Sequence, residues 1–431
     1  MKVAILGGGF TGLAAAYYLR TKGYEVTVYE REHELGGLAV GFKRPEWGWS
    51  LERAYHHLFA TDRDILKLAK DTGFTGIFYQ SPETASLYKV GDEYRTYPVD
   101  TPVDFMRFPL LNILERIRTA MVLAFLKLTP PLPIYNTNTS ESFFINLMGE
   151  NAWNTLFGQP MRKKFGKYAG NILASFIWAR VKVRTKSLGY VEKGFQNFVE
   201  YLENTNRKTG VTINKGTEVQ KIEKKEMGYV ISYKDLKSKN KTEIFDIVIS
   251  TLPSPILARI ATIFPKKYFD RFKKLKYLNA VVLIIESKQP ILEKTYWLSI
   301  CTPDIPTMFI GQHTNFIDKK NYGGKHIAYI GWYIDQTDPL WNMSEKEIYT
   351  MMIPHIKKIN PEFKAKEVKT YVFKAPFAQP VFDKEFVQNK PTFQTPLENF
   401  YIANLDMTYP NDRGTNYAVK LGREVSDLIS R

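Results

Sequence analysis

The sequence predicts an α/β protein whose dinucleotide-binding domain is interrupted by a second domain. The chain opens with a short apolar run, a glycine-rich turn and an Ala-rich helical pattern, the order of a βαβ unit. Further strand and helix patterns that suit the same sheet recur in the middle and at the end of the chain. Its 431 residues exceed one simple domain, and 44% hydrophobic residues supply a large core, which excludes a disordered or fibrous protein.

The first thirty residues contain the elements of a βαβ unit in order. Residues 2–6 (KVAIL) predict a buried parallel strand, residues 13–20 a helix, and residues 24–29 a second strand that ends on Glu30. The first strand is too short for the apolar core of a signal peptide and has no cleavage site after it. We therefore interpret it as part of the fold.

The turn between the first strand and the helix matches GxGxxG at Gly7, Gly9 and Gly12. Gly7 permits the tight turn, Gly9 lets the backbone approach a pyrophosphate, and Gly12 lets helix and strand pack closely. The N-terminus of the helix presents N–H groups to the phosphates. Glu30 follows Gly12 by 18 residues, where an acid accepts a hydrogen bond from a ribose hydroxyl.

Residues 30–39 (EREHELGGLA) extend this unit with a second glycine pair. The stretch resembles the N-terminal motif of the FAD-dependent amine oxidase, protoporphyrinogen oxidase, phytoene desaturase and UDP-galactopyranose mutase superfamily. The resemblance implies that this segment wraps the pyrophosphate and ribityl chain of FAD. The FAD contacts that it implies here are Gly7, Gly9, Phe10, Thr11, Gly12, Glu30, Arg31, Gly36, Gly37 and Leu38.

Three later stretches resemble the same superfamily. Residues 189–222 match a glycine, helix, strand, strand segment in which Val219 is implied to contact the adenine. Residues 246–253 match the strand that returns to the sheet and ends at Thr251. Residues 399–418 match the C-terminal flavin motif, in which a helix N-terminus approaches the flavin pyrimidine. The implied contacts in this motif are Asp406, Gly414, Thr415, Asn416 and Tyr417.

These matches predict the domain organisation. A discontinuous Rossmann-type FAD-binding domain is expected from residues 1–95, 186–262 and 376–431. An inserted α+β substrate domain is expected from residues 96–185 and 263–375.

Two basic stretches lie in the inserted segments. Residues 104–128 predict one long helix, with an apolar face against the core or, alternatively, lying in a membrane interface. Its uncharged run is too short to span a bilayer. Residues 266–277 interleave lysines with aromatics; helical spacing favours a solvated helix with aromatics inside over nucleic-acid binding. We expect no nucleic-acid partner.

The excess of basic over acidic residues predicts either an anionic partner or a lysine-rich surface. Sixty Lys and Arg stand against 44 Asp and Glu, a formal net charge of +16. We expect a small-molecule substrate, lipid-like or anionic, and a cytoplasmic protein with peripheral membrane association as an alternative. One cysteine and six histidines without metal-binding spacing predict no protein-ligated metal and no disulfide.

The candidate catalytic residues are a histidine pair, and the candidate substrate-binding residues include one near the C-terminal motif. His56 and His57 follow the segment that wraps the pyrophosphate, and either could face the flavin or substrate. Arg413 and Trp332 are weaker substrate candidates, and Tyr333 beside Trp332 could also line a pocket. Residues 162–164 (RKK) are expected to be a surface cluster, with binding of a substrate phosphate or carboxylate as the alternative. Residues 279–286 lack the lysine, and the C-terminal motif lacks the cysteine, that some superfamily members carry. We therefore expect non-covalent FAD and not simple amine oxidation.

These observations together predict a FAD-dependent oxidoreductase that transfers a hydride from a substrate C–H or C–N bond to flavin N5, with the substrate unassigned. One alternative is a mutase-like isomerase that uses reduced FAD without net redox on a nucleotide-sugar. Another is a non-catalytic FAD-binding module of a membrane assembly.

Overall fold

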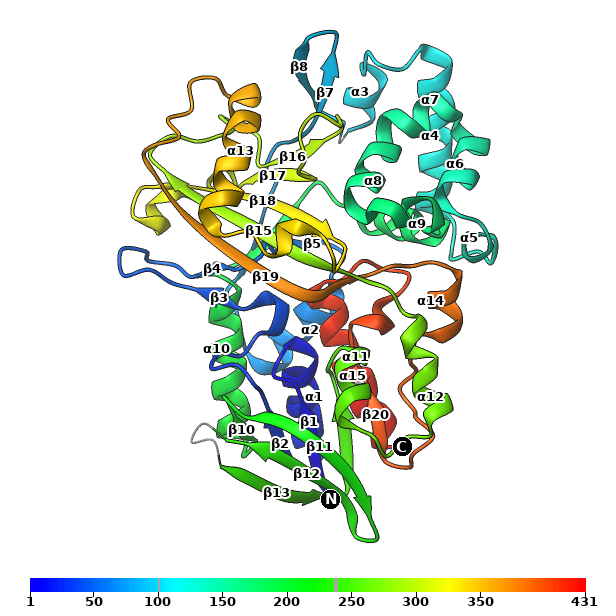
Figure 1. Cartoon of the computed structure of the whole chain (residues 1–431), viewed down its shortest axis with the longest axis vertical. Coiled ribbons are helices and arrows are strands. Elements are labelled where there is room, and N and C mark those ends of the chain that lie inside the picture. Colours follow the sequence, from blue (N-terminus) through cyan, green and yellow to red (C-terminus); the bar gives the residue numbers. More distant parts are fainter. Residues whose placement is uncertain (100, 236–238) are drawn as a thin grey trace.

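The computed structural model describes residues 1–99, 101–235 and 239–431. A parallel sheet with its helices forms one half of the molecule, and a larger, mostly antiparallel sheet forms the other (Figure 1). A cluster of short helices lies beside the larger sheet. Segments from both ends and from the middle of the chain meet in the first half.

The parallel sheet has five strands, and its three central strands are buried over most of their length. Their order is β10 (Thr212–Asn214), β2 (Glu25–Tyr29), β1 (Lys2–Leu6), β14 (Ile247–Ser250) and β20 (Phe400–Ile402). Its main helices are α1 (Phe10–Thr21), α2 (Arg63–Thr72), α10 (Phe195–Lys208) and α15 (Thr415–Ile429). The strands predicted near residues 2–6, 24–29 and 246–251 are confirmed. In the C-terminal flavin motif the strand covers only Phe400–Ile402, and a 3₁₀ helix follows at Leu405–Thr408.

A three-stranded antiparallel sheet packs beside this layer. It consists of β11 (Glu218–Lys225), β12 (Gly228–Lys234) and β13 (Asn240–Phe245). The hairpin between β11 and β12 turns at Glu226 and Met227, and Gly228 takes a φ of 125° that favours glycine. Between Val219 and Lys221 the register shifts by a bulge.

The larger sheet has seven strands. Their order is β19 (Val368–Pro380), β15 (Tyr277–Ser287), β18 (His326–Ile334), β17 (Phe309–Gln312), β16 (Trp297–Ile300), β7 (Thr84–Val90) and β8 (Glu93–Tyr97). Helix α13 (Glu345–Ile359) packs on it and buries Ile348, Met352 and Ile356. Because β7 pairs with β16 and β8 with β7, residues 84–95 join this sheet. The expected boundary at residue 95 falls inside β8, and the expected boundary at 375 falls inside β19.

Two small sheets connect the halves. The two-stranded sheet pairs β3 (Gly41–Phe42) with β4 (Leu51–Glu52), and the three-stranded one orders β5 (Leu58–Phe59), β9 (Leu188–Val191) and β6 (Ile77–Gln80). The remaining helices of this region are α11 (Ser254–Ile260), α12 (Lys266–Asp270) and α14 (Lys384–Asn389). Phe269 and Phe272 of the second basic stretch are buried, which confirms that its aromatics pack inward.

Residues 102–183 form the helical cluster. Its helices are α3 (Pro102–Met106), α4 (Ile113–Leu128), α5 (Ile134–Thr137), α6 (Ser140–Met148), α7 (Glu150–Trp153), α8 (Gln159–Phe165) and α9 (Ala174–Val183). The single helix predicted over 104–128 is wrong: the chain breaks before Asn112, which caps α4 in a capping box with Glu115. Pro109 lies in the break. Within the three described ranges, no helix combines the length and the apolar character that crossing a bilayer requires.

Candidate cofactor and substrate site

The N-terminus of α1 lies at the end of β1, where the glycine-rich turn places it. Gly9 precedes the helix, no side chain caps it, and its first turn carries no acid, so its N–H groups and dipole are available to an anion. A Cβ on Gly12 would come 2.0 Å from the carbonyl oxygen of Gly7. This turn therefore accepts only glycine at position 12, as the sequence reasoning predicted.

The second glycine pair folds back onto this turn. The N–H of Gly36 donates to the carbonyl of Gly8 at 3.0 Å, and Gly36 has a φ of 122°. A Cβ on Gly37 would come 3.3 Å from the Cα of Gly9. The two predicted glycine segments, about thirty residues apart in the chain, thus form one continuous backbone surface.

Glu30 closes the same turn at the end of β2. Its carboxylate accepts from the N–H groups of Gly8 at 2.8 Å and Glu32 at 2.9 Å. A cavity of about 130 Å³ adjoins it. The lining residues are Glu30, Glu32, His33, Glu34, Gly37, Val40 and Arg53. The predicted cofactor residues Glu30 and Gly37 therefore share one cavity.

Arg53 is a lining residue that the sequence reasoning missed. The β3–β4 pairing brings it back, with its N–H donating to the carbonyl of Val40 at 3.0 Å. Its guanidinium lies 5.6 Å from the ring centre of Phe373, and its buried Nε has no hydrogen-bond partner. A buried guanidinium nitrogen without a partner suits an anionic ligand. No local motif surrounds Arg53, because only the strand pairing brings it to the cavity.

A second uncapped helix N-terminus belongs to α15. Gly414 precedes the helix without a side-chain cap. Helices α1 and α15 run parallel and close together, since a Cβ on Gly422 would come 2.4 Å from the carbonyl oxygen of Thr11, and Lys22 pairs with Asp427 near their C-terminal ends. Both N-termini therefore lie at the same end. The side chain of Asn416 is already engaged, accepting from two N–H groups at the start of α2.

Other residues of the implied FAD set have structural partners. Thr251 donates to the carbonyl of Leu6 at 2.8 Å. Asp406 is buried and accepts hydrogen bonds from Ser254 and Tyr277. Leu38 and Arg31 are exposed, whereas Phe10 and Thr11 are buried. Since Asp406 holds the chain after β20 to α11 and β15, its geometry supports an anchoring role, and its predicted cofactor contact stays a prediction.

The histidine pair lies at the junction of the two halves. His56 Nδ1 is 2.7 Å from the carbonyl oxygen of Ala54, so Nδ1 carries the proton. His57 Nδ1 is 3.3 Å from the hydroxyl of Tyr296. Burial lowers the pKa of His56 to about 4 and that of His57 to about 3. Both side chains are therefore neutral at physiological pH.

A cluster of cations lies immediately before α15. Asp412 accepts from Lys164 of α8 at 2.6 Å and from Arg180 of α9. Arg413 donates to the carbonyl of Ala378 at 2.8 Å and to the hydroxyl of Tyr333. We call Lys164, Arg180, Asp412, Arg413 and Tyr333 the cation cluster. It has three cations and a single carboxylate.

The ring of Tyr333 lies against two of these cations. Lys164 Nζ is 5.1 Å and the Arg413 guanidinium carbon 4.7 Å from its centre, within cation–π range. The pKa of Lys164 is lowered to about 7, chiefly by burial and also by Arg180 and Arg413, against the opposing effect of Asp412. Burial alone would raise the pKa of Asp412, but Lys164 and Arg180 hold it well below its usual range. An additional anion here would offset the uncompensated positive charge.

Two sequence expectations change at this cluster. Lys164 is only 7% exposed, so the expectation of a surface cluster at residues 162–164 is wrong for this lysine. Trp332 packs in the core beneath α13, whereas Tyr333, its neighbour on β18, faces Arg413. Adjacent strand residues point to opposite faces. Of this pair, Tyr333 therefore lies in the cation cluster and Trp332 does not.

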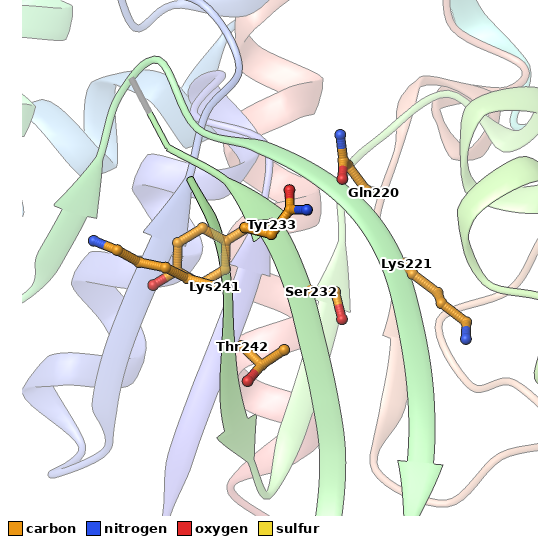
Figure 2. Close-up of a pocket in the computed structure, with 7 residues that line it drawn as sticks. Gln220, Lys221, Ser232, Tyr233, Lys241 and Thr242 are labelled. Carbon is orange, nitrogen blue, oxygen red and sulfur yellow. The ribbon is translucent and has the colours of Figure 1, made fainter. Parts of the chain in front are cut away.

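A hollow outside this region lies on the three-stranded sheet. Figure 2 shows side chains of all three strands around it, and its volume is about 540 Å³. Its lining is Gln220, Lys221, Ser232, Tyr233, Asn240, Lys241 and Thr242. Val219 instead packs against the core. This polar surface brings together none of the predicted site residues. Among the described residues, no group of three or more His, Cys, Asp or Glu is placed to hold a metal.

Comparisons with known proteins agree with this geometry. The model of the flavin containing amine oxidoreductase family matches residues 10–429. Coproporphyrinogen III oxidase of Staphylococcus aureus is 23% identical over 335 residues, 68% of this chain and 69% of that protein. An oxidoreductase from Methanosarcina mazei superposes with a TM-score of 0.77 at 18% identity, covering 100% of both chains. Reduced UDP-galactopyranose mutase gives 0.75 at 17% identity, covering 99% of this chain and 95% of the other.

The structure has the features that a flavin dinucleotide requires. Two uncapped helix N-termini point from the same end, and a glycine-lined surface and the buried Nε of Arg53 adjoin one of them. The family model spans nearly the whole chain. The chain therefore belongs to the flavin containing amine oxidoreductase family and is a FAD-dependent oxidoreductase.

Proposed function

We propose that the chain binds FAD non-covalently and oxidises a small anionic molecule. Bound FAD supplies the redox chemistry, accepting a hydride at N5 from a substrate C–H or C–N bond. The N-termini of α1 and α15, Glu30 and Arg53 are the proposed FAD contacts. No cysteine lies near α15, since the sole cysteine is Cys301 in the other half, which supports non-covalent binding.

The cation cluster carries the proposal for the substrate. The cluster has three cations but one carboxylate, Asp412, which pairs with Lys164 and Arg180 just before the helix that is proposed to approach the flavin. A carboxylate or phosphate of the substrate would accept hydrogen bonds from Lys164 and Arg413 and would compensate the surplus charge. The cluster joins α8 and α9 to residues 412–413, so it lies between the proposed FAD-binding and substrate domains.

The neutral histidines fit an orienting role. With Nδ1 of His56 donating to Ala54, its Nε2 is left as an acceptor. Because the pKa values of both histidines lie far below 7, neither serves as a proton-transfer group near neutrality. We propose that they shape the site and exclude water.

The FAD-binding domain is proposed to be discontinuous and of Rossmann type, with the substrate domain inserted. Strand pairing supports revised boundaries near residues 81 and 381, in place of 95 and 375. The other boundaries stay as expected from the sequence.

An anaerobic bleaching screen tests the proposed function. FAD-loaded protein is mixed with pairs of compounds that differ in a carboxylate or phosphate, drawn from amines, porphyrinogens and polyenes. We expect flavin reduction to favour the anionic member, and Lys164→Met to raise its KM about 10-fold or more. Lys163→Met is the matched control, since Lys163 donates instead to the carbonyl of Ile305. Equal reduction of charged and neutral members would refute the anionic substrate.

A mutase-like reaction is the second candidate. The pairing of Arg413 with Tyr333, beside Lys164, is a feature able to hold a diphosphate. Conversion of a nucleotide-sugar only in the presence of dithionite, with no net flavin oxidation or reduction, would favour this reaction over substrate oxidation.

A further inference from the structure

An exposed apolar face covers three consecutive helices of the helical cluster. Nine of the fourteen large apolar side chains that are exposed in the described part of the chain lie between residues 103 and 134. We call these nine the α3–α5 face. They are Val103, Met106, Ile113, Leu114, Ile117, Met121, Phe125, Leu128 and Ile134. Helices α3 and α4 lie at an outer corner of the molecule (Figure 1).

Helix α4 is apolar on two sides. Thr119, Val122 and Leu126 are buried against the rest of the cluster. Leu114, Ile117, Met121, Phe125 and Leu128 recur every three or four residues, which places them on one outward side. Leu114 is 75% and Leu128 81% exposed. An apolar strip of this length on a surface helix indicates a binding partner.

Four cations flank the face without carboxylate partners. Arg116 donates to the carbonyls of Met106 and Asn112, and Arg118 to those of Asn146 and Leu147. Lys127 donates to the carbonyl of Arg184 at 2.8 Å, and Lys182 to that of Lys127 at 2.7 Å. Within residues 1–99, 101–235 and 239–431 none of the four forms an ion pair. Their charges are therefore held in place but not compensated.

The charge of the surrounding segment has the same sign. Residues 96–185 contain eleven Lys and Arg against five Asp and Glu. A second copy of this chain would present the same positive charge, so self-association through the face is opposed by repulsion. A bilayer surface with anionic headgroups instead offers an apolar interior to the side chains and negative charge to the cations.

We propose that the α3–α5 face docks the protein onto an anionic lipid surface. The apolar side chains enter the boundary between headgroups and acyl chains, and Arg116, Arg118, Lys127 and Lys182 contact the headgroups. Helix α9 connects this face to the cation cluster, because Lys182 contacts α4 and Arg180 contacts Asp412. Docking therefore brings the proposed substrate site close to the lipid surface.

Vesicle co-sedimentation of the full FAD-loaded protein tests the docking. Vesicles of phosphatidylcholine alone are compared with vesicles containing 30% phosphatidylglycerol, at about 50 mM and 500 mM salt. We expect binding to the anionic vesicles and weaker binding at high salt. Leu114→Ser/Met121→Ser/Leu128→Ser is expected to lower the vesicle partition coefficient at least about tenfold.

Met227→Ser/Ile244→Ser is the matched control, because both side chains are exposed outside the face, Met227 in the hairpin turn and Ile244 on β13. It is expected to bind vesicles like the wild type. Flavin content and the thermal unfolding midpoint show that each variant is folded. Wild-type protein that binds neither vesicle, or equal loss of binding in both variants, would overturn the proposal. Wild-type dimers that the triple substitution dissociates, without vesicle binding, would assign the face to a second copy. These outcomes do not depend on the substrate or on turnover.

Discussion

The two ends of the proposed site are built by different means. Around α1, the site consists of backbone: glycines in contact, an uncapped helix and one glutamate held by N–H groups. Around the cation cluster, it consists of long side chains that come from α8, α9, β18 and residues 412–413. The first end is local in sequence, and the second requires the whole fold to be assembled. The two ends should therefore respond differently to substitution.

Gly12→Ala tests the backbone end and carries the largest expected effect. The new Cβ would lie 2.0 Å from a backbone oxygen, which no side-chain rotation relieves, so β1 and α1 must separate at a cost of about 3 kcal/mol or more. We expect little folded protein, and at least a hundredfold weaker FAD binding in what is recovered. Gly48→Ala is the control, since its Cβ would meet only one atom, at 3.7 Å. Flavin absorbance and thermal unfolding measure both. Normal FAD content in Gly12→Ala would mean that α1 does not need this close approach.

Asp412→Asn tests the side-chain end. Removing the only carboxylate of the cation cluster leaves Lys164, Arg180 and Arg413 facing one another, at a cost of about 3 kcal/mol. Lys164→Met should cost less, because Asp412 keeps Arg180 as a partner. Urea unfolding of the two variants and wild type measures the order. A less stable Lys164→Met than Asp412→Asn would show that the aromatic contacts of Lys164, rather than the ion pairs, hold the cluster.

The difference between the backbone end and the side-chain end explains which parts of the site the sequence predicts. GxGxxG, the second glycine pair and Glu30 are recognisable because their spacing alone determines the turn. Arg53 is not recognisable, since strand pairing brings it to the site. Lys164 is recognisable only as one residue of a basic run with two possible roles, since helix packing decides which of its members is buried in the cluster. Trp332 and Tyr333 show the limit clearly: a strand pattern predicts that they face opposite sides, but not which side meets Arg413. The break of the helix predicted over 104–128 is the exception, because Pro109 and the Asn112–Glu115 capping box were readable in advance.

Glu52 lies between the two ends and should make stability depend on pH. It is fully buried, accepting from the Tyr190 hydroxyl and the Phe195 N–H at 2.7 Å each, and burial raises its pKa from 4.5 to about 7. A raised acid pKa favours the folded state below pH 4.5, and this contribution is lost as pH rises to 7. We expect the wild type to lose about 3 kcal/mol over this range relative to Glu52→Gln. Urea unfolding at pH 5 and pH 8 measures the free energy of unfolding of both proteins. The same change between the two pH values in both proteins would exclude ionisation of Glu52.

Arg53→Met tests whether Arg53 contributes to FAD binding at the backbone end of the site. The methionine keeps much of the packing against Phe373 but removes the buried Nε, whose hydrogen bond to an anion contributes about 1.5–3 kcal/mol. We expect the Kd for FAD to rise by about 10- to 100-fold, with the stability of the FAD-free protein unchanged. Fluorescence quenching of FAD by the apoprotein measures the affinity. An unchanged Kd would mean that the cavity beside Glu30 holds solvent and not FAD.

The pH profile of kcat/KM distinguishes the histidines from Lys164, and it carries the smallest expected effect. Because His56 and His57 have pKa values of about 4 and about 3, neither changes charge between pH 5 and 8, and His56→Gln and His57→Gln should keep the shape of the profile. Lys164, with a pKa of about 7, is charged below that pH, so kcat/KM for an anionic substrate should fall as pH rises through 7. Lys164→Met should remove this fall. An inflection that disappears with either histidine variant and persists in Lys164→Met would transfer the titrating role to the histidine pair, and with it the charge that meets the substrate.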